Sequence, residues 1–134
     1  MKSKKKIGSF FPVRNKTPKC VLIYDDDQEI LLLCKIILER YYHVETRMKC
    51  ENIISDISQI KPDIILMDLW IPAIGGEKAI ALKKNDPVTQ FVPVILFSAN
   101  DEIDKICIKT GANGYISKPF DIDTLKEVIE KNIL

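Results

Sequence analysis

Acidic, hydroxyl and lysine side chains come directly after short apolar runs in this sequence. Three aspartates at positions 25 to 27 follow VLIY, and Asp68 follows DIILM. Ser98 and Lys118 come directly after two later runs. Adjacent carboxylates repel one another, and keeping them ionised in a partly dehydrated cleft is costly unless a cation neutralises them. Oxygen ligands without a neighbouring His or Cys favour Mg²⁺, or Mn²⁺, which accepts a phosphate oxygen as a further ligand.

A second interpretation of the segment DDDQE stays open at this point. Asp is a common N-cap residue, and acidic residues in the first turn of a helix are favoured by the helix dipole. This interpretation explains the aspartates at positions 25 to 27 as the start of a helix. It does not explain why Asp68, Ser98 and Lys118 recur at the ends of other apolar runs.

Strand-length apolar runs alternate with longer segments of helical period, which predicts five repeats of a strand followed by a helix. The expected strands cover residues 20–24, 43–47, 63–67, 92–97 and 114–117, and the expected helices cover 28–40, 50–60, 75–84, 101–110 and 125–133. The middle of segment 28–40 is apolar almost throughout, so we expect this helix to pack on more than one side. We expect Gly111 to end the helix of residues 101–110.

This order predicts an α/β fold with a doubly wound, five-stranded parallel sheet and five helices on its two faces. Such sheets bind ligands at the carboxyl ends of their strands, near the point where the strand order reverses. Parallel strands would bring Asp25, Asp26, Asp68, Ser98 and Lys118 to one edge of the sheet. The sequence therefore predicts a site at that edge.

Length and charge indicate one domain with a basic N-terminal tail. The 134 residues are 46% hydrophobic, which suits a single core. Residues 1–19 contain seven Lys or Arg and no acid, and the remainder has 13 basic residues against 19 acidic ones, a charge of about −6. We expect a flexible tail at 1–18 and a domain at 19–134. A short solvated tail of this kind usually binds nothing, although nucleic acid or anionic lipid would suit its charge.

The sequence predicts a cytoplasmic protein without a membrane contact. Its first residues have the charge of a signal peptide but lack the apolar stretch, and no run of about 18 apolar residues occurs. The four cysteines lie at least 14 residues apart, without the spacing of a zinc site or a redox motif. We expect reduced, mostly buried thiols.

Four stretches together resemble the receiver domain of two-component response regulators. They are VLIYDDD, PDIILMDLWIPAIGG, VPVILFSAN and GANGYISKPF, in this order between residues 21 and 120. The resemblance covers about residues 19 to 134 and implies the flavodoxin-like fold of CheY-like proteins. It also implies a signalling protein rather than an enzyme. The only reactions that such a protein catalyses are its own Mg²⁺-dependent phosphorylation and dephosphorylation.

The resemblance implies a role for each matching residue of the site. Asp68 matches the aspartate that accepts a phosphoryl group from a sensor histidine kinase or a histidine phosphotransfer protein. Asp26, Asp68 and the backbone carbonyl of Trp70 match direct Mg²⁺ ligands, and Asp25 matches the carboxylate that acts through a water. Lys118 matches the lysine that pairs with Asp68 and then with the phosphoryl oxygens.

Two further matches imply a conformational switch. Ser98 matches the hydroxyl residue that bonds the phosphoryl group, and Tyr115 matches the aromatic that changes rotamer with it. Together they would alter the surface of the fourth helix, fifth strand and fifth helix. We expect no DNA-binding domain in this protein and therefore expect the signal to pass to an unknown protein target. Apolar residues such as Ile108 would suit a phosphorylation-linked homodimer. The family also implies a cis peptide between Lys118 and Pro119.

Two other functions use similar residues. An aspartate-nucleophile phosphatase of the haloacid dehalogenase type combines Asp, Lys, Ser or Thr and Mg²⁺ on a parallel sheet. Asp25 and Asp27 have the DxD spacing of that class, whereas LMDLWIP and SKPF favour the receiver domain. A pseudo-receiver, an interaction module with the fold but not the chemistry, would not need every acidic, hydroxyl and lysine position to be filled.

Overall fold

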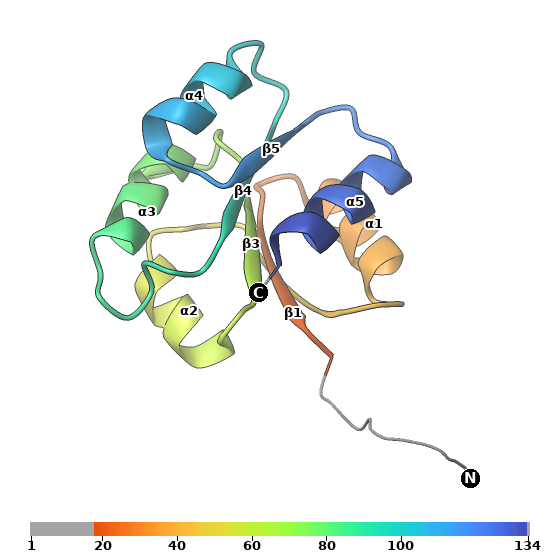
Figure 1. The fold of residues 1–134 in the computed structure, drawn as a ribbon, viewed down its shortest axis with the longest axis horizontal. Helices are drawn as coiled ribbons and strands as arrows, with labels where there is room; N and C mark the ends of the chain where they lie inside the picture. Colours follow the sequence, from red (N-terminus) through yellow and green to blue (C-terminus); the bar gives the residue numbers. More distant parts are fainter. Residues whose placement is uncertain (1–17, 134) are drawn as a thin grey trace, which may run out of the picture.

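Strands and helices alternate throughout residues 18–133, which are the residues that the computed structural model describes. The strands are β1 (Cys20–Tyr24), β2 (His43–Arg47), β3 (Ile64–Met67), β4 (Val94–Ser98) and β5 (Gly114–Ser117). The helices are α1 (Gln28–Leu38), α2 (Ile53–Ile60), α3 (Gly75–Lys84), α4 (Ile103–Thr110) and α5 (Ile122–Asn132). All strand pairs are parallel and the strand order is β2-β1-β3-β4-β5 (Figure 1). The predicted α/β fold is confirmed.

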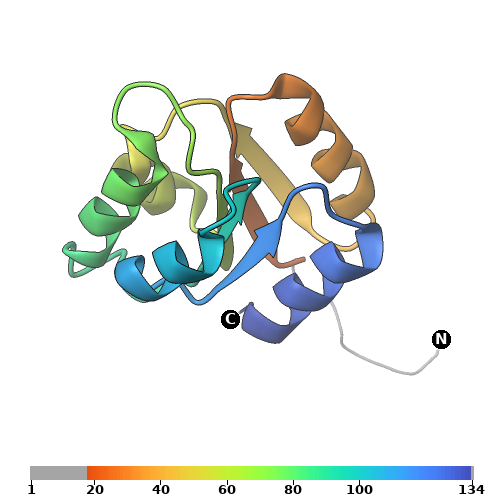
Figure 2. The same cartoon turned by 90° about the horizontal axis from the view of Figure 1, so that it is seen from above.

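Helices cover both faces of the sheet and enclose two hydrophobic cores. Helices α1 and α5 lie on one face, and α2, α3 and α4 lie on the other (Figure 2). Successive residues of β1 alternate between them: Val21 and Ile23 belong to the core under α1 and α5, and Leu22 and Tyr24 belong to the opposite one. A strand covered on both faces needs apolar side chains at every position, which explains the uninterrupted apolar runs.

Several predicted boundaries differ from the structure by one to three residues. Strand β4 begins at Val94 rather than at Val92, because the N–H of Val92 donates to the carbonyl of Thr89 in the preceding loop at 3.3 Å and Pro93 has no N–H. Its last residue is Ser98, which the sequence placed just beyond the strand. The first helix ends at Leu38 instead of Arg40. Gly111 has a left-handed backbone and ends α4, as predicted.

The prediction that the first helix packs on more than one side is wrong. Helix α1 buries one stripe, which consists of Leu31, Cys34 and Leu38. Leu32, Leu33 and Ile36 are 60%, 47% and 60% exposed. Within the described residues no element covers this outer side, so an apolar sequence did not here mean a buried helix.

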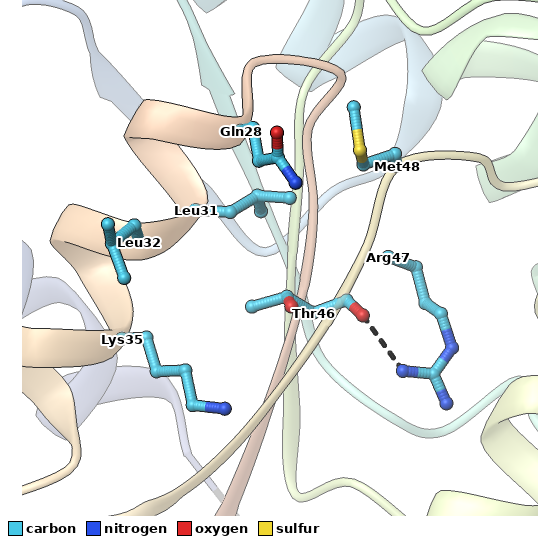
Figure 3. A pocket seen from close by; sticks show the side chains of 7 residues that line it. All are labelled: Gln28, Leu31, Leu32, Lys35, Thr46, Arg47 and Met48. Atoms are coloured by element: carbon cyan, nitrogen blue, oxygen red, sulfur yellow. Dashed lines mark hydrogen bonds between the residues drawn. The ribbon is translucent and has the colours of Figure 1, made fainter.

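Strand β2 is an edge strand of the sheet, and the side chain of Arg47 covers one of its outward-facing backbone carbonyls. The N–H of His43 donates to the carbonyl of Lys19 just before β1, and the carbonyl of Arg47 accepts from the N–H of Asp25 just after it. The carbonyl of Thr46 therefore points away from β1. Figure 3 shows Arg47 folding back at this edge, beside the shallow pocket between α1 and β2, with Nη1 donating to the Thr46 carbonyl at 2.8 Å. This bond occupies an acceptor that a strand of another chain would otherwise use.

Two other expectations concern membranes and thiols. None of the helices in residues 18–133 has the length and apolar character needed to cross a bilayer. All four cysteines are free, and three of them are buried, with Cys107 partly exposed. Except for Pro18, the predicted basic tail lies outside the described residues.

Candidate functional site

The predicted site residues lie at the carboxyl ends of four neighbouring strands. Asp25 follows β1, Asp68 follows β3, Ser98 ends β4 and Lys118 follows β5. The strand order reverses between β1 and β3. In open α/β sheets, ligands bind at this kind of reversal point because the chain leaves the two strands toward opposite faces. The predicted site therefore coincides with the location that the topology favours.

Three carboxylates form a cluster at this edge. One oxygen from each of Asp25, Asp26 and Asp68 lies within 4.8 Å of the others. Asp25 and Asp68 are buried, whereas Asp26 is exposed. Burial, and next the charge of Asp25, raises the pKa of Asp68, while the ammonium of Lys118 and the backbone N–H of Trp70 act in the opposite direction. The cluster therefore carries negative charge that a bound cation would stabilise.

The third aspartate of the DDD segment has a different task. The side chain of Asp27 caps α1, with Oδ1 accepting from the N–H groups of Glu29 at 2.9 Å and Ile30 at 3.4 Å. Its own N–H donates to Oδ1 of Asp25 at 2.9 Å. The helix-start interpretation of the segment is thus right for Asp27, and Asp25 and Asp26 belong to the cluster.

The Lys118 side chain reaches both buried carboxylates. Its Nζ lies 2.6 Å from Oδ2 of Asp25 and 3.6 Å from Oδ1 of Asp68. The backbone N–H of Lys118 donates to the carbonyl of Ser98 at 2.9 Å, which fixes where this side chain starts. The predicted partner of Lys118 is Asp68, whereas Asp25 is the nearer partner in the structure. The peptide between Lys118 and Pro119 is cis, as expected.

The other predicted residues differ in burial. Ser98 is fully buried, and its Oγ accepts from the N–H of Asn100 at 3.2 Å. Tyr115 lies on β5 and is 44% exposed, and Trp70, two residues after Asp68, is 65% exposed. The structure brings the acid cluster and Lys118 together, places Ser98 at the adjacent strand end, and leaves Trp70 mostly exposed and Tyr115 half-exposed.

Two residues outside the predicted set, Gly76 and Phe97, also shape the site. A Cβ atom at Gly76 would collide with the backbone oxygen of Asp68, so glycine allows α3 to approach the loop that carries this aspartate. The ring of Phe97 on β4 lies under the ammonium of Lys118, with its centroid 4.7 Å from Nζ. The glycine pair in IPAIGG and the aromatic that ends the run VPVILF are the signals that could have indicated them.

Comparison with known protein families agrees with this geometry. Residues 21–130 match the model of the response regulator receiver domain. The chain belongs to this family. Receiver domains are signalling modules of two-component systems that interact with phosphodonors and effectors and generally bind Mg²⁺ at an acidic pocket. The receiver-domain prediction is therefore confirmed.

Individual relatives show how much of a receiver protein this chain covers. Protein PilH of Pseudomonas aeruginosa is 34% identical over 114 residues, which are 81% of this chain and 93% of PilH. The response regulator PleD of Caulobacter vibrioides is 33% identical over 104 residues, which are 75% of this chain but only 23% of PleD. The crystal structure of a CheY-like receiver domain protein from Methanospirillum hungatei is 27% identical, with a TM-score of 0.75, and the match covers 86% of this chain and 93% of that one.

Proposed function

We propose that this receiver domain accepts a phosphoryl group on Asp68 from a sensor histidine kinase or a histidine phosphotransfer protein. The observation that carries the proposal is the contact of a lysine ammonium with two buried carboxylates at the reversal point of the sheet. A structural ion pair would need one carboxylate, whereas Lys118 has two and the exposed Asp26 adds a third. The filled acidic, hydroxyl and lysine positions also favour a phosphorylated receiver over a pseudo-receiver.

The acid cluster suits a hard divalent cation. Its ligand atoms are oxygens only, which favours Mg²⁺ or Mn²⁺ over metals that prefer nitrogen or sulfur. We propose Asp26, Asp68 and the Trp70 backbone carbonyl as direct ligands, with Asp25 acting through a water. When bound, the cation would neutralise the carboxylates and the phosphoryl oxygens.

Asp68 is the nucleophile in this proposal. One of its Oδ atoms attacks the phosphorus of the donor, and the bond from phosphorus to the donor's imidazole nitrogen breaks as the acyl phosphate forms. The electron pair of the broken bond stays on the departing imidazole. Lys118, 3.6 Å from Oδ1 of Asp68, then transfers its hydrogen bonds from Asp25 to the phosphoryl oxygens and offsets their charge.

Phosphorylation would change the surface of the domain through one residue on β4 and one on β5. We assign the buried hydroxyl of Ser98 as the group that bonds a phosphoryl oxygen, and Tyr115 as the aromatic that moves inward from its half-exposed position. The surface of α4, β5 and α5 would change as a result. Ile108 is 84% exposed on α4 and would contact either a protein target or a second copy of the domain.

The same proposal fixes the broader role of the domain. It acts as a cytoplasmic signalling protein, and its only turnover is its own phosphorylation and dephosphorylation. The signal passes to a protein partner. A phosphatase role would instead require turnover of a phosphate ester in excess over the protein.

Intact mass after incubation with Mg²⁺ and acetyl phosphate tests this proposal. We expect one phosphoryl adduct, lost in Asp68→Asn and in EDTA but retained in Asp27→Asn, because asparagine preserves the cap of α1. Loss of the adduct in Asp27→Asn with retention in Asp68→Asn would favour the phosphatase alternative. No adduct on the folded wild-type protein, with either acetyl phosphate or a competent kinase, would contradict phosphorylation altogether.

A further inference from the structure

Lys118 has to cross a neighbouring strand to reach its carboxylates. Strand β4 lies between β5, which leads into Lys118, and the pair β3 and β1, which lead into Asp68 and Asp25. The side chain of Lys118 therefore passes over the end of β4. The ring of Phe97 lies there, with its centroid 4.7 Å from Nζ.

Phe97 is held firmly in this position. It is fully buried in the core under α1 and α5. Its ring meets that of Phe120 edge-on, with centroids 5.1 Å apart and planes at 61°. Phe120 lies two residues after Lys118, so the segment that carries the lysine also packs against the ring beneath it. Tight packing leaves the ring few alternative rotamers.

The ammonium has lost much of its water at this site. The Lys118 side chain is only 18% exposed. Among the described residues, its ammonium, which has three N–H donors, pairs only with the carboxylates of Asp25 and Asp68. An aromatic face attracts a cation through its quadrupole, and this attraction strengthens when water is excluded. An aliphatic side chain in the same place would fill the space without offering this attraction.

We propose that Phe97 is a positioning residue for phosphorylation. Its ring face holds the ammonium of Lys118 over the end of β4 and supports it while its hydrogen bonds move from Asp25 to the phosphoryl group on Asp68. The attraction requires only that the ammonium stay over the ring face, within about 6 Å of the centroid, so it persists during a short movement. This inference rests on the proposed function and adds to it a residue that touches neither substrate nor metal.

Fluorinated phenylalanines at position 97 test the inference. Each added fluorine withdraws electron density from the ring face and changes the ring volume little. We expect the rate of phosphorylation by acetyl phosphate to fall with each fluorine, reaching a loss of about three- to tenfold with trifluorophenylalanine. The same series at Phe120, whose ring meets Phe97 but is not the one under Nζ, is the matched control and should change the rate less than about twofold.

Urea unfolding of every variant separates positioning from stability. A rate that falls stepwise at position 97 while the free energy of unfolding stays constant supports the inference. A flat series at position 97, or an equal fall at position 120, overturns it. If the unmodified protein forms no adduct, the proposed function fails and this inference fails with it, whereas an adduct combined with a flat series removes the inference alone. Phe97→Leu, which lacks the ring, should lose at least as much rate as the trifluoro variant.

Discussion

Two lysines are largely buried at opposite edges of the sheet, and their partners differ in charge. At the carboxyl edge, Lys118 contacts the carboxylates of Asp25 and Asp68. Near the amino edge, at the end of α3, Lys83 is 3% exposed and donates from Nζ to the backbone carbonyl of Gln90 at 2.8 Å. The carbonyl of Lys83 in turn accepts from the hydroxyl of Thr89 at 2.8 Å.

The difference shows what distinguishes a reactive edge from a structural one. Burial, with a smaller contribution from the charge of Lys84, lowers the pKa of Lys83 to about 8, because a neutral carbonyl does not replace the lost water. This lysine ties α3 to the loop before β4. At the carboxyl ends of the strands, burial leaves an excess of carboxylates over Lys118, and an added cation relieves their repulsion. The uncompensated negative charge of the carboxylates, rather than the burial of a lysine, therefore distinguishes the candidate site.

Removing each lysine in turn is the most direct way to break this comparison. Lys118→Ala should slow phosphorylation by acetyl phosphate by about 100-fold, because no other side-chain cation contacts Asp68 among the described residues. Lys83→Met, which keeps a chain of similar length in the pocket, should change this rate by less than about twofold. Intact mass against time measures both rates. Equal rates for the two variants would mean that the carboxyl edge has no special role.

The pH dependence of the free energy of unfolding tests whether Lys83 has the lowered pKa. The pKa of Lys83 is about 8 in the folded protein and near its ordinary 10.5 in the unfolded chain. The unfolded state therefore binds more protons between these values, so this residue makes the free energy of unfolding rise with pH, by on the order of 2 kcal/mol.

The variant Lys83→Met should lack this rise, and urea unfolding at pH 7.5 and about 10 measures the difference. The comparison with wild type is needed because burial raises the pKa of Cys50 and Cys20 to about 11, and these thiols make stability fall with pH over part of the same range. Identical pH profiles for the two proteins would show that Lys83 stays charged in the fold.

Stability without metal tests the charge excess at the carboxyl edge. Because burial and Asp25 raise the pKa of Asp68, its ionised form destabilises the metal-free fold at neutral pH. Asp68→Asn should therefore raise the free energy of unfolding in EDTA, by about 1 kcal/mol. Added Mg²⁺ should stabilise the wild type more than the variant and reduce the difference. A variant that is less stable than wild type in EDTA would contradict the account of this cluster.

The sequence was sufficient for the fold class and for the prediction that Asp25, Asp68 and Lys118 lie close together. Continuous apolar runs require strands covered on both faces, and the polar residues that end them, such as Asp25, Asp68 and Lys118, must then meet at one edge. This inference needs only the order of the elements. The capping role of Asp27 could also be predicted, because it depends only on Glu29 and Ile30, which are near neighbours in the chain.

The remaining features depend on which elements become neighbours. Apolar periodicity did not reveal that the side of α1 with Leu32 and Ile36 lacks a covering element. The nearer contact of Lys118 with Asp25, and the ring of Phe97 beneath it, follow from the path of one side chain across β4. Lys83 looks like any surface lysine until the α3–β4 loop folds over it. Strand order and side-chain paths decide these contacts, and local sequence does not encode them.

Locating the acyl phosphate is the measurement that tests the central claim most directly. Borohydride reduces an aspartyl phosphate to homoserine, so the protein is treated with Mg²⁺ and acetyl phosphate, reduced, digested and sequenced by mass spectrometry. We predict homoserine at position 68 alone, with none when EDTA is present. Homoserine at position 25, 26 or 27, or at none of the aspartates despite a phosphoryl adduct on the intact protein, would contradict the assignment of Asp68 as the acceptor.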